Sequence, residues 1–193
     1  MNHRRPLTIL NSANLEEMKN QVQSLLAQCQ VIRSGMISSI GLPGKVGFPR
    51  SGHTEDLELG EADLDWVPTQ SVIGATGLEC LITPNTRIQF ASCQQACREE
   101  SVNWAERIGQ GLQQDLLGRS RLFQVPGNLQ PFQGSRFLFN THVTDIYEPA
   151  ANFTLTHHRN WSIADEGNLG IMYTVGRDRV TSDVPVQEAP QCE

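Results

Sequence analysis

The chain has 193 residues, 38% of them hydrophobic, and a formal net charge of -6. This length suits one domain with its own core, and the hydrophobic fraction is too high for a chain that is disordered throughout. The acidic balance without a basic block argues against a nucleic-acid partner. No run approaches the roughly 20 apolar residues that cross a bilayer. The apolar run 7–10 near the N-terminus is too short for a signal-peptide core, so we expect a cytoplasmic protein or one exported by an unconventional route.

The cysteines are odd in number and irregular in spacing. They are Cys29, Cys80, Cys93, Cys97 and Cys192. This pattern is not typical of a disulfide framework, and it contains no closely spaced pair of the zinc-binding kind. The sequence therefore predicts free thiols in a reducing compartment.

The first third of the chain predicts a strand, a helix and a second strand. The apolar run 7–10 is typical of a short buried strand. Asn14 suits a helix N-cap, and Glu17 stands three residues later as in a capping box, so apolar residues at helical spacing predict a helix over 14–29. Residues 31–40 are rich in β-branched side chains and predict the next strand. A β-α-β opening favours a mostly parallel sheet with helices on its faces.

The middle of the chain is less regular. Residues 41–65 are glycine-rich and then acidic, which predicts a long surface loop or a hairpin. Residues 71–81 favour a helix that glycines interrupt. Pro84-Asn85 predicts a turn just before a strand over 87–91.

The second half contains the clearest helical pattern. An apolar stripe predicts a helix over 101–117 that ends at Gly118. Further strands are expected at 121–125, 136–140, 152–156 and 170–175. The proline-containing end of the chain, from Thr181 onward, is typical of a disordered tail. We therefore expect a single α/β domain over 1–180 and a tail over 181–193.

Cys93 is the strongest candidate for covalent chemistry. It follows the predicted strand 87–91, and reactive groups gather at the carboxyl ends of strands in parallel sheets. Thiols act as nucleophiles when a neighbour takes their proton, and imidazole is the usual partner. His53, in the loop upstream, is the best partner by chain order. The alternative is a buried structural thiol, because free cysteine is among the most buried residue types.

The order of these features resembles the caspase-like cysteine peptidases. Ser51-Gly52-His53 and Ala91-Ser92-Cys93 match the positions of that group's catalytic histidine and cysteine, each following a strand. The bacterial branch that includes the self-processing cysteine peptidase domains of large toxins is the most similar in order. The resemblance spans about residues 30 to 125. It implies a three-layer α/β sandwich with a mostly parallel sheet, and peptide-bond hydrolysis by a Cys93–His53 dyad in a bacterial effector, processing domain or defence peptidase.

The same resemblance implies a place for the oxyanion. The backbone amides of Thr54 and Cys93 would hold it, although Thr54 stands where the family usually has a glycine after the histidine. A protein or peptide would be the substrate, and no cofactor or metal is expected.

Two other classes of function stay open. The first is a binding module on the same fold that lacks the dyad's activity, which the Thr54 substitution favours. The second is a metal-dependent hydrolase, whose ligands would come from the later part of the chain. Those ligands would be His142 with His157 or His158, together with Asp145 or Asp165.

Overall fold

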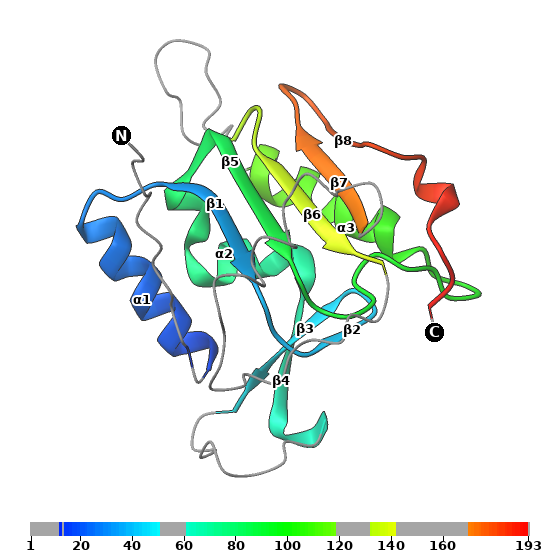
Figure 1. Cartoon of the computed structure of the whole chain (residues 1–193), viewed down its shortest axis with the longest axis horizontal. Helices are drawn as coiled ribbons and strands as arrows, with labels where there is room; N and C mark the ends of the chain where they lie inside the picture. The colour runs from blue at the N-terminus through cyan, green and yellow to red at the C-terminus, as the bar shows by residue number, and fades with distance from the viewer. Residues whose placement is uncertain (1–11, 13, 51–60, 119–131, 142–169, 193) are drawn as a thin grey trace, which may run out of the picture.

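The structure, a computed structural model, is a mixed α/β fold and describes residues 12, 14–50, 61–118, 132–141 and 170–192. Two sheets account for its described strands (Figure 1). The larger sheet has the order β1-β5-β6-β7-β8, formed by Ile32–Ile37, Ile82–Phe90, Arg136–Asn140, Gly170–Val175 and Val180–Ser182. The smaller sheet has the order β2-β3-β4, formed by Gly41–Leu42, Lys45–Pro49 and Leu64–Pro68.

The larger sheet is mixed rather than mostly parallel. Strand β5 pairs in parallel with both β1 and β6, whereas β6, β7 and β8 pair antiparallel. The expectation of a parallel sheet therefore holds for β1, β5 and β6 only. The last two strands follow each other through a short connection, which suits antiparallel pairing.

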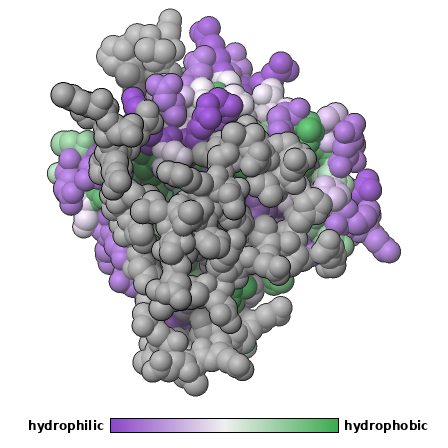
Figure 2. Space-filling model, in the orientation of Figure 1, coloured by the Kyte–Doolittle hydropathy of each residue, from purple (hydrophilic) through white to green (hydrophobic). Residues whose placement is uncertain are grey.

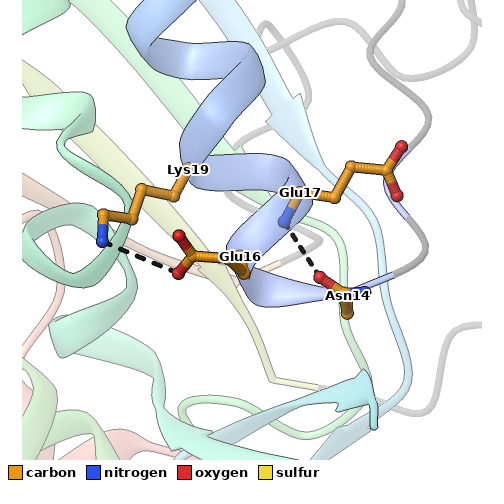
Figure 3. A network of polar contacts seen from close by, with 4 residues as sticks. All are labelled: Asn14, Glu16, Glu17 and Lys19. Atoms are coloured by element: carbon orange, nitrogen blue, oxygen red, sulfur yellow. Dashed lines mark hydrogen bonds and ion pairs between the residues drawn. The ribbon is translucent and has the colours of Figure 1, made fainter. Parts of the chain in front are cut away.

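Helix α1, Leu15–Ala27, begins where the capping residue predicts. The Asn14 side chain accepts a hydrogen bond from the Glu17 amide at 2.9 Å, and Glu16 forms an ion pair with Lys19 at 3.6 Å (Figure 3). The carboxylates of this first turn also suit the positive end of the helix dipole. The predicted helix over 14–29 is thus confirmed, although its last turn ends at Ala27.

One hydrophobic core joins the helices to the larger sheet. Helix α2 is Val72–Thr76 and helix α3 is Trp104–Leu112. Their buried apolar side chains, and Val22 of α1, share a core cluster with alternate residues of β5, β6 and β7, among which Phe90 stacks on Phe139 at 4.7 Å. The three described helices therefore cover one face of the sheet.

The opposite face of the sheet carries a different set of buried side chains. Gln89, Leu138 and Met172 alternate with the core residues along their strands, so they point away from these helices. All three are buried, but they lie outside the core cluster. The described part of the chain thus shows one helical layer on one sheet face.

The expected turn at Pro84-Asn85 is wrong, because β5 begins at Ile82 and contains both residues. Thr86 compensates locally for the proline. Its hydroxyl accepts a hydrogen bond from the Thr83 amide at 2.8 Å and donates one to the Ile32 carbonyl. The register between β1 and β5 shifts at this point, as it does where a bulge admits proline into a strand.

Five other predictions are confirmed in outline. Within the loop or hairpin expected at 41–65, β2 and β3 form a hairpin. The interrupted helix at 71–81 is α2 followed by a 3-10 turn over Leu78–Leu81, and the helix over 101–117 is α3 continued by a π-helical turn over Gln113–Leu117. The strands expected at 136–140 and 170–175 are β6 and β7. Those expected at 7–10, 121–125 and 152–156 lie outside the described residues.

The expected disordered tail is wrong for residues 181–192. Strand β8 pairs with β7, a 3-10 turn follows at Val186–Glu188, and Cys192 forms a disulfide with Cys97. The prediction of free thiols is wrong for this pair, whereas Cys29, Cys80 and Cys93 are not disulfide-bonded in the described part of the chain. The two bonded cysteines are 95 residues apart, so their spacing gave no sign of the bond.

The described surface visible in Figure 2 is mainly hydrophilic, with small, separate hydrophobic areas. The large apolar side chains that are exposed come from several places in the chain: Leu26, Val31, Met36, Ile40 and Val184. Among the described helices, none combines the length and the hydropathy that a membrane span requires.

Candidate active site at the carboxyl edge of the sheet

Cys93 lies where the carboxyl ends of three parallel strands meet. It follows the end of β5 by three residues, is half-buried, and is not part of the disulfide. Backbone hydrogen bonds tie this stretch to both neighbouring strands: the Ala91 amide donates to the Ile37 carbonyl at 2.8 Å, and the Ala96 amide donates to the Asn140 carbonyl at 2.9 Å. We call residues 91–98 the Cys93 segment. These bonds fix its position relative to β1 and β6.

The Gln95 side chain holds the Cys93 segment against the smaller sheet. Its side chain is fully buried, and its amide nitrogen donates to the carbonyls of Lys45 at 2.8 Å, Cys93 at 2.9 Å and Leu42 at 3.2 Å. Its amide oxygen accepts a hydrogen bond from the Thr69 hydroxyl. Because a buried amide costs free energy unless it is hydrogen-bonded, this side chain strongly favours one arrangement of the segment against the smaller sheet.

Two glycines let the turn between β2 and β3 approach this segment. A Cβ atom on Gly41 would lie 2.7 Å from both the amide nitrogen and the carbonyl oxygen of Cys93. Gly44 has a φ of +68°, and its amide donates to the Gln95 carbonyl at 3.1 Å. The smaller sheet consequently contacts the backbone of Cys93 directly, and Figure 1 shows it beside the carboxyl ends of β1 and β5.

The backbone turns sharply immediately after Cys93. Gln94 has a φ of +48°, in the left-handed region that non-glycine residues seldom adopt. Such conformations persist where the surrounding structure imposes them, and here the buried Gln95 and the disulfide at Cys97 follow within three residues. Cys93 is therefore held between an extended strand and a constrained turn.

Polar side chains are buried along the same edge of the sheet. Ser92 and Asn140 are fully buried and Thr141 is almost so. The Ser92 hydroxyl makes no hydrogen bond within the described residues. Buried polar groups are usually hydrogen-bonded, so this concentration next to a thiol is typical of a functional region rather than of a purely structural core.

His53 and Thr54 lie outside the described residues, as do His142, Asp145, His157, His158 and Asp165. The structure therefore brings together Cys93 and the ends of β1 and β6, but it does not test the Cys93–His53 pair. Beyond the end of β1, the chain runs through Ser38 and Ser39 to Ile40, which is 49% exposed. In the part of the chain that is described, no three histidine, cysteine or acidic side chains group as metal ligands do.

Several site residues were missed by the sequence reasoning. Gly41 and Gly44 flank Leu42-Pro43, which is typical of a turn, but nothing nearby indicated that the turn would contact Cys93. Gln95 gave no signal at all, because its side-chain partners other than Cys93 are 26 to 53 residues away along the chain. The oxyanion position expected at the Cys93 amide is next to Gly41.

Compared with known proteins, the chain matches no protein-family model, no curated protein and no solved structure. Any functional conclusion therefore depends on the geometry around Cys93 and on the short motifs of the sequence.

Proposed function

We propose that the chain is a cysteine-dependent hydrolase of peptide bonds with Cys93 as its nucleophile. The observation that carries this proposal is the position of a half-buried cysteine, outside the disulfide, at the carboxyl edge of three parallel strands. The hydrogen bonds of Gln95 hold that thiol's backbone in one place, and such preorganisation is what a nucleophile requires. A caspase-like, three-layer arrangement, with a protein or peptide as substrate, belongs to the same proposal.

The reaction would take two steps. The Cys93 sulfur attacks the carbonyl carbon of the scissile bond while His53 accepts the thiol proton, and His53 then gives that proton to the leaving amine. Water, deprotonated by His53, hydrolyses the resulting thioester, releases the carboxylate product and restores the thiol. The amides of Cys93 and Thr54 would hydrogen-bond the oxyanion in both steps.

Peptide cleavage by matched variants tests the proposal. The wild-type protein, Cys93→Ala, His53→Ala and Cys80→Ala are each incubated with a mixture of peptides, and new termini are identified by mass spectrometry. We expect cleavage by the wild type and Cys80→Ala, and a loss of at least about 100-fold in both Cys93→Ala and His53→Ala, since removal of a nucleophile or its base has effects of this order. Cys80 is the control because it is a free, exposed thiol away from the site.

Thiol labelling gives a second, substrate-independent measurement. An iodoacetamide probe should react with Cys93 faster than with Cys80, and His53→Ala should remove this difference. Equal rates at the two cysteines, together with cleavage that survives Cys93→Ala, would overturn the proposal.

A binding module on the same fold is the second candidate, and Ile40 favours it. This half-exposed apolar residue lies three residues after the end of β1 and immediately before Gly41, which closely approaches the Cys93 backbone. An exposed apolar side chain at this place suits contact with a binding partner. Under this reading, Cys93→Ala leaves every measured property of the protein unchanged except thiol labelling, and no peptide is cleaved by the wild type.

A further inference from the structure

The C-terminal end of the chain crosses back to the Cys93 segment. We call residues 183–192 the C-terminal strap. It leaves β8 at Asp183, whose amide donates to the Met172 carbonyl and whose carboxylate accepts from the Met172 amide, both at 2.9 Å. It then runs beside the stretch between β5 and α3 (Figure 1). The strap thus joins the far edge of the sheet to the last residues of the Cys93 segment.

Beyond β8, the strap contacts Arg98, Asn103 and the hydrophobic core. Arg98 exchanges two backbone hydrogen bonds with it, donating to the Pro190 carbonyl at 2.7 Å and accepting from the Cys192 amide at 2.9 Å. The Asn103 side chain, which also caps α3, donates to the Val186 carbonyl at 2.8 Å. Ala189 belongs to the core cluster, Val186 packs against it, and the Gln191 side chain amide lies within hydrogen-bond distance of Arg98. The disulfide to Cys97 adds a covalent link that keeps the end of the strap beside Arg98 when these contacts open.

The two cysteines of this bond differ in burial. Cys97 is fully buried, whereas Cys192 is half-buried. An attacking thiolate has access from the Cys192 side, and Cys97 is the leaving group. Access and the choice of sulfur govern the rate of thiol–disulfide exchange.

We propose that the Cys97–Cys192 disulfide is a redox modification site, at which a dithiol reductant releases the C-terminal strap from Arg98 and Asn103. One thiolate of the reductant attacks the Cys192 sulfur and forms a mixed disulfide, while Cys97 departs and takes a proton. The second thiol of the reductant then displaces Cys192 as a thiol and closes the oxidised reductant into its own disulfide. Two electrons pass from the dithiol to the protein.

Release of the strap changes the surroundings of Cys93 indirectly, through Arg98 and helix α3. Arg98 is the last residue of the Cys93 segment, and the released strap no longer pairs with its backbone. The cap of α3 at Asn103 loses its contact with Val186 as well. This inference does not depend on the proposed peptidase activity, because it concerns the path of the chain and not a reaction at Cys93.

Carboxypeptidase digestion of the folded protein tests the inference. The wild type is treated with carboxypeptidase Y in the presence or absence of dithiothreitol, and the trimmed C-terminus is measured by mass spectrometry. We expect residues before Glu193 to be removed at least about ten times faster in the reduced protein. Cys192→Ser should be trimmed at the fast rate with or without the reductant, and Cys80→Ser, which alters an exposed free thiol, should behave as the wild type.

Two results would overturn the inference. The first is a disulfide that stays intact in the folded protein at millimolar dithiothreitol, as judged by alkylation and mass. The second is a reduced wild type, or a Cys192→Ser variant whose circular dichroism shows it to be folded, that is trimmed as slowly as the oxidised protein. Neither result depends on whether any peptide is cleaved.

Discussion

Gly44 and Gly77 both have left-handed backbones, but their surroundings differ. A Cβ atom on Gly44 would lie 2.1 Å from the Trp104 ring, whereas one on Gly77 would meet no atom within 4 Å. Alanine at Gly77 therefore carries only the cost of the left-handed backbone. Alanine at Gly44 carries that cost and also displaces Trp104 or the β2–β3 turn.

We expect Gly77→Ala to lower the free energy of unfolding by about 1 kcal/mol, the usual cost of a left-handed residue with a side chain. Gly44→Ala should lower it by about 3 kcal/mol or more, since overpacking adds to the backbone term. Urea unfolding followed by tryptophan fluorescence measures both values. Equal losses in the two variants would show that Trp104 moves aside without cost.

For single residues, the sequence predicted contacts between near neighbours in the chain and missed contacts between residues that are far apart in the chain. The Asn14 cap was predictable because its partner, the Glu17 amide, is three residues away. Gln95 was not, because its oxygen and nitrogen meet Thr69 and Lys45, which the chain brings close only through the smaller sheet. Cys93 itself was predictable as a strand-end residue, but the turn at Gln94 that follows it was not.

At the scale of elements, Tyr173 forms a polar link between α3 and the sheet. Its hydroxyl donates a hydrogen bond to the Ala105 carbonyl, and Gly109 leaves room for its ring, since a Cβ there would lie 2.7 Å from the Tyr173 Cε1 atom. Burial raises the pKa of Tyr173 well above its usual range, and the charges of Asp183 and Glu106 raise this pKa further. The phenol consequently stays protonated in the folded protein at pH values where it ionises in the unfolded chain.

This difference predicts a loss of stability in alkali. A raised folded-state pKa stabilises the fold below the unfolded value, near pH 10, and that contribution declines as the pH rises further. Between about pH 9 and about pH 11 we expect the melting temperature of the wild type to fall more steeply than that of Tyr173→Phe, which has no phenol to ionise. Thermal melts at several pH values test this expectation. Parallel curves for the two proteins would show that burial of Tyr173 does not limit its ionisation.

Among the helices and strands, those with a repeating pattern of apolar residues were predicted best. Strands β6 and β7 and helices α1 and α3 have apolar spacing that repeats over several residues, and their positions were predicted. Strand β5 was predicted too short, because Pro84-Asn85 signals a turn unless a partner such as Thr86 supplies the missing hydrogen bonds. That compensation needs β1 beside it, so it is a property of the pair and not of the strand.

At the scale of the whole molecule, the disulfide closes a loop of about half the chain. Its cysteines are 95 residues apart, and a bond over such a distance mainly restricts the unfolded state. We expect Cys192→Ser to lower the free energy of unfolding by about 2–5 kcal/mol. Urea titrations without reductant measure the change, with Cys80→Ser as the control expected within about 0.5 kcal/mol of the wild type. A loss no larger than that of the control would mean that the unfolded state is already restricted without the bond.

The helices on one face of the sheet have a consequence for where a ligand can bind. Chain order moves across the sheet in one direction, from β1 to β5 to β6, and α2 and α3, which lie between these strands, share a core. In open sheets that wind both ways, a crevice forms where the winding reverses, but these three strands have no such reversal. The chain instead inserts the smaller sheet between β1 and β5, and its glycine turn lies against the backbone of Cys93. The smaller sheet therefore forms one wall of any cleft at Cys93. Because this sheet is inserted between β1 and β5, the shape of that wall can vary without any change in the strands that carry the thiol.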